Sequence, residues 1–124
     1  MTKKKSGIRW LGKPEKRDYL AAERYLSLLF DEATAARYAK KLRRADVSKF
    51  EAKDLLRASG LQPLGAGNPH VKEDRRRMSK GTPLAPLLLV RHPANATLII
   101  ADGYHRLCAA YSVDEDATIP CCLE

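Results

Sequence analysis

No hydrophobic run in this 124-residue sequence is long enough to cross a membrane. The longest apolar stretches, residues 86–90 and 97–101, are far shorter than the roughly 20 residues that a transmembrane helix needs. The basic N-terminus is followed by no apolar segment, so we expect no signal peptide. These absences predict a cytoplasmic protein that does not contact a membrane.

Cysteine is scarce. The three cysteines, Cys108, Cys121 and Cys122, are odd in number and lack the spacing of a metal site. Cys121 and Cys122 are adjacent in a predicted strand, where neighbouring side chains point to opposite faces, so at least one should be buried. The sequence therefore predicts free thiols in a reducing compartment.

Acidic residues are too few to balance the basic ones, and the net charge is +8. Residues 1–59 contain sixteen Lys or Arg and eight Asp or Glu, whereas residues 60–124 contain seven of each. The excess charge fits a nucleic-acid footprint or a solvated surface that keeps a small domain in solution. Composition alone does not decide between these two interpretations of the charge. The length predicts one domain over residues 1–124.

The first half predicts three helices joined by short loops. The first is expected over residues 18–30, and the second, which Asp31 caps, ends near residue 45. Ser48 and Glu51 have the spacing of a capping box, which predicts a third helix ending at Gly60.

The second of these helices has one basic face. Its cations are spaced three or four residues apart: Arg37, Lys40, Lys41 and Arg44. No aromatic residue is interleaved with them, so any nucleic-acid contact would be to phosphates and independent of base sequence.

The second half of the sequence predicts alternating helices and strands. Residues 61–64 form at most an edge strand, because they contain a proline. A helix follows over residues 71–80, then strands at 83–90 and 97–101 joined by a turn, a helix at 104–112 and a last strand at 118–123. Pro120 suits the start of an edge strand. This order predicts an α+β fold with a small mixed sheet.

The junction after the strand at 97–101 carries the strongest functional signal. Asp102-Gly103 combines turn chemistry with a helix start, so the amides of residues 103–106 should lie unpaired at a helix N-terminus. We expect them to converge on an electropositive hollow that suits a phosphate, with His105 and Arg106 in reach. The alternative is a simple helix cap, with Arg106 in a structural salt bridge and His105 satisfied locally.

The order of motifs after residue 60 resembles the ParB/sulfiredoxin superfamily. The matching features are Asn68-Pro69 before a helix that ends at Gly81, a Pro-led strand and hairpin, the turn Gly103-Tyr104-His105-Arg106, and a closing Ile119-Pro120 strand. The resemblance covers about half of the chain. It implies a ParB/sulfiredoxin-like core over residues 60–124, preceded by a basic helical extension over residues 1–59.

The resemblance also implies a ligand and roles for the site residues. In these families the G-x-x-R turn holds nucleotide phosphates, so ATP or CTP with Mg²⁺ is expected here, with phosphotransfer or nucleotide hydrolysis as the reaction. Gly103, Tyr104, His105 and Arg106 would cradle a phosphate, and Asn68 and His70 would add contacts to the nucleotide or substrate. Asp102 would cap the helix or orient Mg²⁺, and the candidate catalytic residues are Asp102, His105 and Arg106.

Departures from the family pattern limit this transfer. Tyr104 stands where sulfiredoxins have their nucleophilic cysteine, and His70 stands near a position where they have a lysine. Cys108 is expected to be a buried apolar residue rather than a replacement nucleophile. For a general base, Glu73, Asp74 and Asp102 are equal candidates.

Two other functions stay open. A DNA-binding or nuclease-like module would use the basic N-terminal helices, although a DNA-partitioning clamp is not expected because its further motifs are missing. The other is an antitoxin, toxin or scaffold component, in which the site has lost its function and only stabilises the fold. Oligomeric state is not readable from the sequence.

Overall fold

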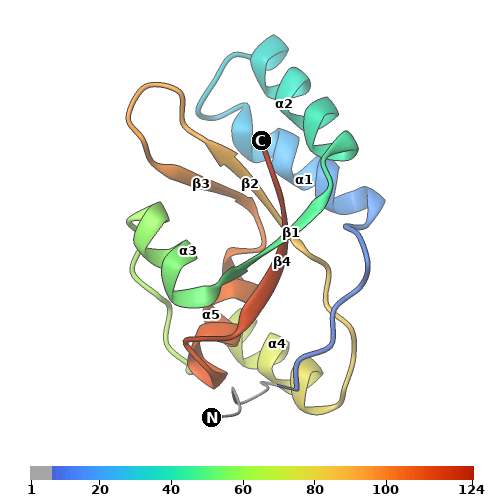
Figure 1. Ribbon diagram of the computed structural model, residues 1–124, viewed down its shortest axis with the longest axis vertical. Coiled ribbons are helices and arrows are strands. Elements are labelled where there is room, and N and C mark those ends of the chain that lie inside the picture. Colours follow the sequence, from blue (N-terminus) through green and yellow to red (C-terminus); the bar gives the residue numbers. More distant parts are fainter. Residues whose placement is uncertain (1–6) are drawn as a thin grey trace.

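The sheet of this protein has four strands in the order β1-β4-β2-β3 (Figure 1). The computed structural model describes residues 7–124; the first six residues, which belong to the basic N-terminus, lie outside the described part. Strand β4 (Thr118–Leu123) pairs antiparallel with β1 (Val47–Glu51) and parallel with β2 (Leu87–Arg91). The sheet is therefore mixed, and the fold is a small α+β fold as the sequence predicts.

Helices cover both faces of the sheet. Alternate residues of β2 point to opposite sides, so Leu88 and Val90 contribute to one buried cluster, and Leu87 and Leu89 contribute to the other. The first cluster packs under α1 (Lys16–Leu26) and α2 (Glu32–Arg44). The second packs under α3 (Ala52–Ser59), α4 (Pro69–Ser79) and α5 (Tyr104–Val113). The continuous apolar run in β2 reflects burial on both faces.

The first two predicted helices are present. Asp31 caps α2 as expected, accepting a hydrogen bond from the Thr34 amide at 2.7 Å. Helix α1 ends at Leu26, four residues earlier than predicted, and Leu29 is 48% exposed. The apolar spacing therefore extends beyond the helix, into the turn that leads to α2.

The capping-box prediction at residues 48–51 is wrong. Ser48 lies in strand β1, where it pairs with Cys121 of β4, and Glu51 is the N-cap of α3 instead of its third residue. The first amides of α3 donate to backbone carbonyls: Ala52 to Ala117 at 2.9 Å and Lys53 to Glu115 at 3.0 Å. Strand pairing and these two backbone hydrogen bonds satisfy the N–H groups that a side-chain cap at Ser48 would have satisfied. The segment predicted as a helical extension thus supplies one strand to the sheet.

Two smaller strand predictions also need correction. Residues 61–64 form no strand. Strand β4 lies inside the sheet and not at its edge, because β1 and β2 flank it. Pro120 is tolerated there because the pairing of β4 with β2 begins only at Cys121.

The remaining elements follow the sequence pattern closely. Strand β3 (Leu98–Asp102) forms an antiparallel hairpin with β2, and α5 begins two residues after it ends. Trp10 makes an isolated bridge to Leu84 and packs against the core, which fixes the described N-terminal segment to the body of the fold. Over residues 7–124, none of the helices combines the length and apolar character that a bilayer span requires.

Candidate functional site

The turn from β3 into α5 requires glycine at position 103. Gly103 has φ +106°, a conformation that side chains disfavour. A Cβ atom placed there would lie 2.7 Å from Cγ of Leu87 and 2.9 Å from Nη2 of Arg106. The missing side chain therefore lets the sheet and the Arg106 guanidinium approach the start of α5.

The first turn of α5 presents backbone donors that lack an internal partner. The helical ladder begins with the Leu107 amide, which donates to the Gly103 carbonyl at 2.9 Å. No side chain caps this end, and within residues 7–124 the amides of Tyr104, His105 and Arg106 have no acceptor. These donors and the positive end of the helix dipole favour an anion.

A hollow of about 220 Å³ opens at this end of α5. Residues from α4, α5 and the turn line it: His70, Glu73, Asp74, Arg77, Asp102, Gly103, Tyr104, His105 and Arg106. The rings of His70 and His105 lie side by side, with their centroids 4.7 Å apart. The structure thus brings together the predicted residues of the G-x-x-R turn with His70 and all three candidate bases.

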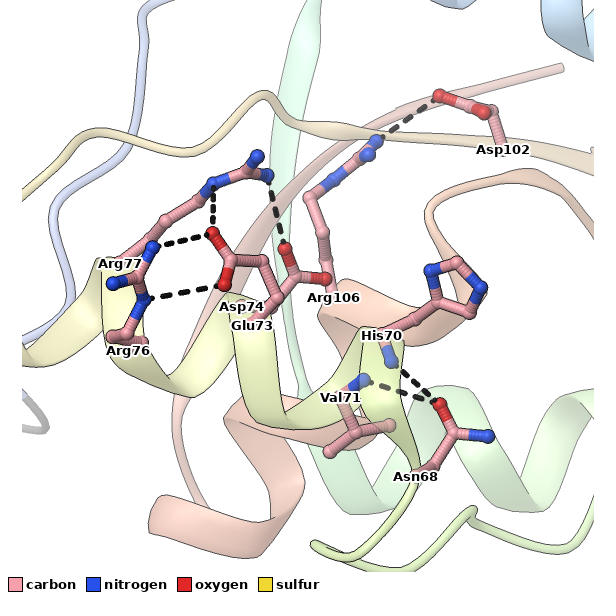
Figure 2. Close-up of polar contacts among 9 residues, drawn as sticks. All are labelled: Asn68, His70, Val71, Glu73, Asp74, Arg76, Arg77, Asp102 and Arg106. Atoms are coloured by element: carbon pink, nitrogen blue, oxygen red, sulfur yellow. Dashed lines mark hydrogen bonds and ion pairs between the residues drawn. The ribbon is translucent and has the colours of Figure 1, made fainter.

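The hollow is not electropositive, which corrects the expectation from the sequence. Three carboxylates and two guanidinium groups line it, and the groups of opposite charge are paired. Arg106 Nη2 lies 3.1 Å from Asp102 Oδ2, and Arg77 Nη1 lies 3.4 Å from Asp74 Oδ1 (Figure 2). An anion that enters the hollow therefore meets guanidinium groups whose positive charge is already balanced by neighbouring carboxylates.

Burial changes the proton affinities of these groups. Desolvation raises the pKa of Asp74 and of Asp102, although Arg106 lowers both in part. Burial and the neighbouring His70 lower the pKa of His105, which favours the neutral ring. The Arg76 guanidinium keeps the pKa of Glu73 below its ordinary value. Asp74 and Asp102 are therefore better suited than Glu73 to act as a general base, since a buried carboxylate with a raised pKa accepts a proton more readily. Asp102 makes the shorter ion pair, 3.1 Å to Arg106 against 3.4 Å from Asp74 to Arg77, so Asp74 is the less tightly engaged of the two.

One buried donor of Arg106 has no partner among the described residues. Its Nη2 atom donates to Asp102 Oδ2 at 3.1 Å and to the Pro86 carbonyl at 3.4 Å. Its Nε atom is buried and has no hydrogen-bond partner among the described residues. Buried donors are rarely left unpaired, and a ligand oxygen would reach this N–H group only if the side chains that cover it moved.

Three predicted positions take structural roles. Asn68 does not line the hollow; its side chain caps α4, accepting from the amides of His70 at 3.0 Å and Val71 at 3.2 Å (Figure 2). The Tyr104 hydroxyl donates to the Gln62 carbonyl. Cys108 is fully buried, and its sulfur accepts from the Leu64 amide at 3.4 Å. The segment at residues 62–64 is thereby held against α5.

Asp102 does not serve as the predicted helix cap, because its carboxylate pairs with Arg106 and α5 has no side-chain cap. Nor do the described residues contain a group of three His, Cys, Asp or Glu side chains placed to hold a metal ion. A bound Mg²⁺ would therefore need most of its ligands from phosphate oxygens and water.

The basic residues of α2 lie on the other side of the sheet from the hollow (Figure 1). Arg37, Lys40, Lys41 and Arg44 are all exposed. Lys41 pairs with Glu124 at 3.4 Å, and the Arg37 guanidinium lies over the Tyr38 ring. The two candidate functions thus depend on separate surfaces.

The sequence analysis missed Asp18 as a residue connected to the site. It appeared only as the start of a helix, yet its side chain is buried beside Asp102. No local pattern reports a contact between positions so far apart in the chain.

No protein-family model, curated protein or solved structure shows significant similarity to this chain. The residues and geometry of the chain itself therefore carry the functional argument.

Proposed function

We propose that this chain binds the phosphate groups of a nucleotide, ATP or CTP, in the hollow at the start of α5. The observation that supports this most directly is the group of three amides at residues 104–106, which have no acceptor within the described chain and face a hollow lined by His70, His105 and Arg106. This arrangement is typical of phosphate sites at helix N-termini.

The size of the hollow indicates which part of the nucleotide enters. About 220 Å³ is below the range of about 300–1,000 Å³ that encloses a whole drug-sized ligand. The phosphate chain fits within it, and the nucleoside would lie at the opening beside His70 and Tyr104. Stacking on these rings contributes little base specificity, since every base has a π-face.

The carboxylates of the hollow support delivery of the phosphates with Mg²⁺. Glu73, Asp74 and Asp102 would repel a bare polyphosphate, whereas a Mg²⁺-bound chain carries less negative charge. Within this proposal, phosphotransfer or hydrolysis would use Asp74 to accept a proton from a hydroxyl group or from water, and Arg106 to stabilise charge on the transferred group.

A thermal-shift titration tests the proposal. ATP or CTP with Mg²⁺ at millimolar concentration should raise the melting temperature by a few degrees, because a ligand of the folded state stabilises it. Arg106→Ala should abolish the shift, since it removes the guanidinium with the unpaired Nε atom. Release of inorganic phosphate, measured in parallel, separates binding from turnover.

The matched control is Arg91→Ala. Arg91 is exposed at the far end of the β2–β3 hairpin, opposite Leu98, and its loss changes the net charge by the same amount. This variant should respond to nucleotide as the parent protein does. If neither nucleotide shifts the melting temperature of the parent protein, the proposal fails.

A second candidate is DNA binding by the face of α2 that carries Arg37, Lys40, Lys41 and Arg44. Over residues 7–124, only Lys41 of these four makes an ion pair, so most of this charge is available to phosphates. Catalysis on DNA has less support, because the described residues contain no acidic cluster that could hold a metal ion.

A further inference from the structure

The two N-terminal helices form a second hollow, away from the start of α5. Helices α1 and α2 pack side by side on the face of the sheet opposite α4 and α5 (Figure 1). The groove between them, called here the α1–α2 groove, has a volume of about 630 Å³, larger than the hollow at α5. Its α2 wall contains three small residues, Ala33, Ala35 and Ala36. Short side chains on a helix leave space that side chains of another helix can fill.

Exposed apolar side chains gather beside this groove. Within residues 7–124, seven large apolar side chains are exposed, and four of them belong to α1 and the turn that follows it: Leu20, Tyr25, Leu28 and Leu29. Leu20 lines the groove and is 53% exposed. Leu28 is 81% exposed and directly follows Ser27, another lining residue. Single exposed apolar residues are ordinary, but a group of them beside a groove indicates an interaction surface.

The groove also carries both signs of charge. Glu23, Arg24 and Glu32 line it, and none of the three makes an ion pair within residues 7–124. An anionic ligand would pair with Arg24 alone and would be repelled by the two carboxylates. The surface that fits this groove is therefore apolar and brings both a cation and a carboxylate.

A second copy of this chain offers each of these features. When two copies meet about a two-fold axis, the same surface of each takes part, so every contact occurs twice. The exposed leucines of one copy would then lie against the alanines of the other. Arg24 and Glu32 stand on opposite walls of the groove, so the α1 helix of a second copy lying along it brings its Arg24 to Glu32. The net charge of +8 opposes self-association least here, where two carboxylates accompany one cation.

We propose that the α1–α2 groove is a homodimer interface, in which the α1–α2 pairs of two copies pack against each other about a two-fold axis. The contact buries Leu20 and Leu28 and pairs Arg24 of each copy with Glu32 of the other. It goes beyond the proposed function and does not depend on it, because the hollow at α5 lies on the other face of the sheet.

Sedimentation equilibrium at about 0.15 M salt, where repulsion between distant exposed charges is screened, tests the proposal. The parent protein should form a dimer with a Kd in the micromolar range. Leu20→Glu and Leu28→Glu should each raise the Kd by about tenfold or more, because each places a carboxylate in an apolar contact. Both positions are exposed, so both variants should keep the circular dichroism spectrum of the parent protein.

The matched control is Leu61→Glu. Leu61 is an exposed leucine in the segment after α3, away from the α1–α2 groove, and its replacement makes the same change of size and charge. This variant should dimerise as the parent protein does.

An exchange of charges tests the ion pair separately. Arg24→Glu alone should raise the Kd by about three- to tenfold, because it places like charges opposite each other. The double variant Arg24→Glu, Glu32→Arg has the net charge of the parent protein and again brings opposite charges together, so it should recover most of the lost affinity. A double variant that dimerises no better than Arg24→Glu would overturn the pairing of Arg24 with Glu32.

A parent protein that stays monomeric up to about 1 mM would overturn the whole proposal, since a contact that weak is not a specific interface. A dimer that both leucine variants leave intact would do the same, because the two copies would then meet at another surface. Equal weakening by Leu61→Glu would show that added negative charge, and not the groove, controls the association.

Discussion

At the scale of single residues, the hollow combines donors for an anion with acids that oppose one. Glu73, Asp74 and Asp102 contribute three negative charges, and Arg77 and Arg106 contribute two positive charges, when both histidines are neutral. Lowering the pH protonates Asp74 and Asp102 earlier than ordinary carboxyl groups, because burial raises the pKa of each. It also protonates His105, although later than an ordinary histidine. Each proton makes the hollow more favourable to an anion.

Sulfate affinity should therefore increase as the pH falls from about 7.5 to about 5.5, by about three- to tenfold. Sulfate is the suitable probe because it stays a dianion over this range, whereas phosphate titrates. Calorimetric titrations at constant ionic strength measure the effect. Asp74→Asn removes one titrating negative charge, so it should bind sulfate more tightly at about pH 7.5 and show a weaker pH dependence. Affinity that is constant or rises with pH would contradict this account of the hollow.

At the scale of secondary-structure elements, β1 shows how pairing prevails over a local signal. Ser48 and Glu51 match a capping box, and the helix that this pattern predicts does exist, but it begins three residues later than the pattern requires. Residues 47–51 pair along their whole length with β4, and Phe50 packs against the core. Five residues of strand pairing and a partly buried aromatic side chain outweigh one cap, which contributes about 1 kcal/mol.

Ser48→Ala should consequently change the free energy of unfolding by no more than about 0.5 kcal/mol, since an exposed strand serine is replaced and no cap is lost. Asp31→Ala is the matched comparison, because Asp31 does cap a helix; it should cost about 1 kcal/mol. Chemical denaturation of both variants measures the difference. A Ser48→Ala cost equal to that of Asp31→Ala would mean that the capping box forms after all.

At the scale of the whole molecule, the sheet separates the two candidate binding surfaces. Helices α1 and α2 lie on one face, and α3, α4 and α5 lie on the other (Figure 1). The basic face of α2 therefore lies on one side of the sheet, whereas the hollow belongs to the α4–α5 side. Ligands of the two surfaces would act independently except through the contact between α1 and β3.

If the α2 surface binds DNA, a labelled duplex should bind at low salt and lose about tenfold or more in affinity between about 50 and 200 mM salt. The double variant Lys40→Glu, Arg44→Glu should abolish binding. The double variant Lys72→Glu, Arg75→Glu makes the same charge change on α4 and should retain most of it. Fluorescence anisotropy measures all three proteins. Equal losses in the two variants would show that net charge, and not the α2 surface, determines the affinity.

The sequence by itself determined the elements whose signals are local. The hairpin of β2 and β3, the glycine turn after Asp102 and the bounds of β4 follow from side-chain periodicity and backbone preference, which act between near neighbours. The gathering of Gly103, His105 and Arg106 at one helix start follows for the same reason. Clustering of His70 with them rested on the resemblance to the ParB/sulfiredoxin superfamily, which stays a prediction.

Only the tertiary structure decided which residues from distant parts of the chain lie next to these elements and site residues. Pairing with β4 made residues 47–51 a strand, and the packing of α4 against α5 placed Glu73 and Asp74 in a hollow that the sequence predicts to be electropositive. Packing of α1 on β3 placed Asp18 beside Asp102. Burial and charge depend on distances between groups far apart in the chain, and no local pattern encodes those distances.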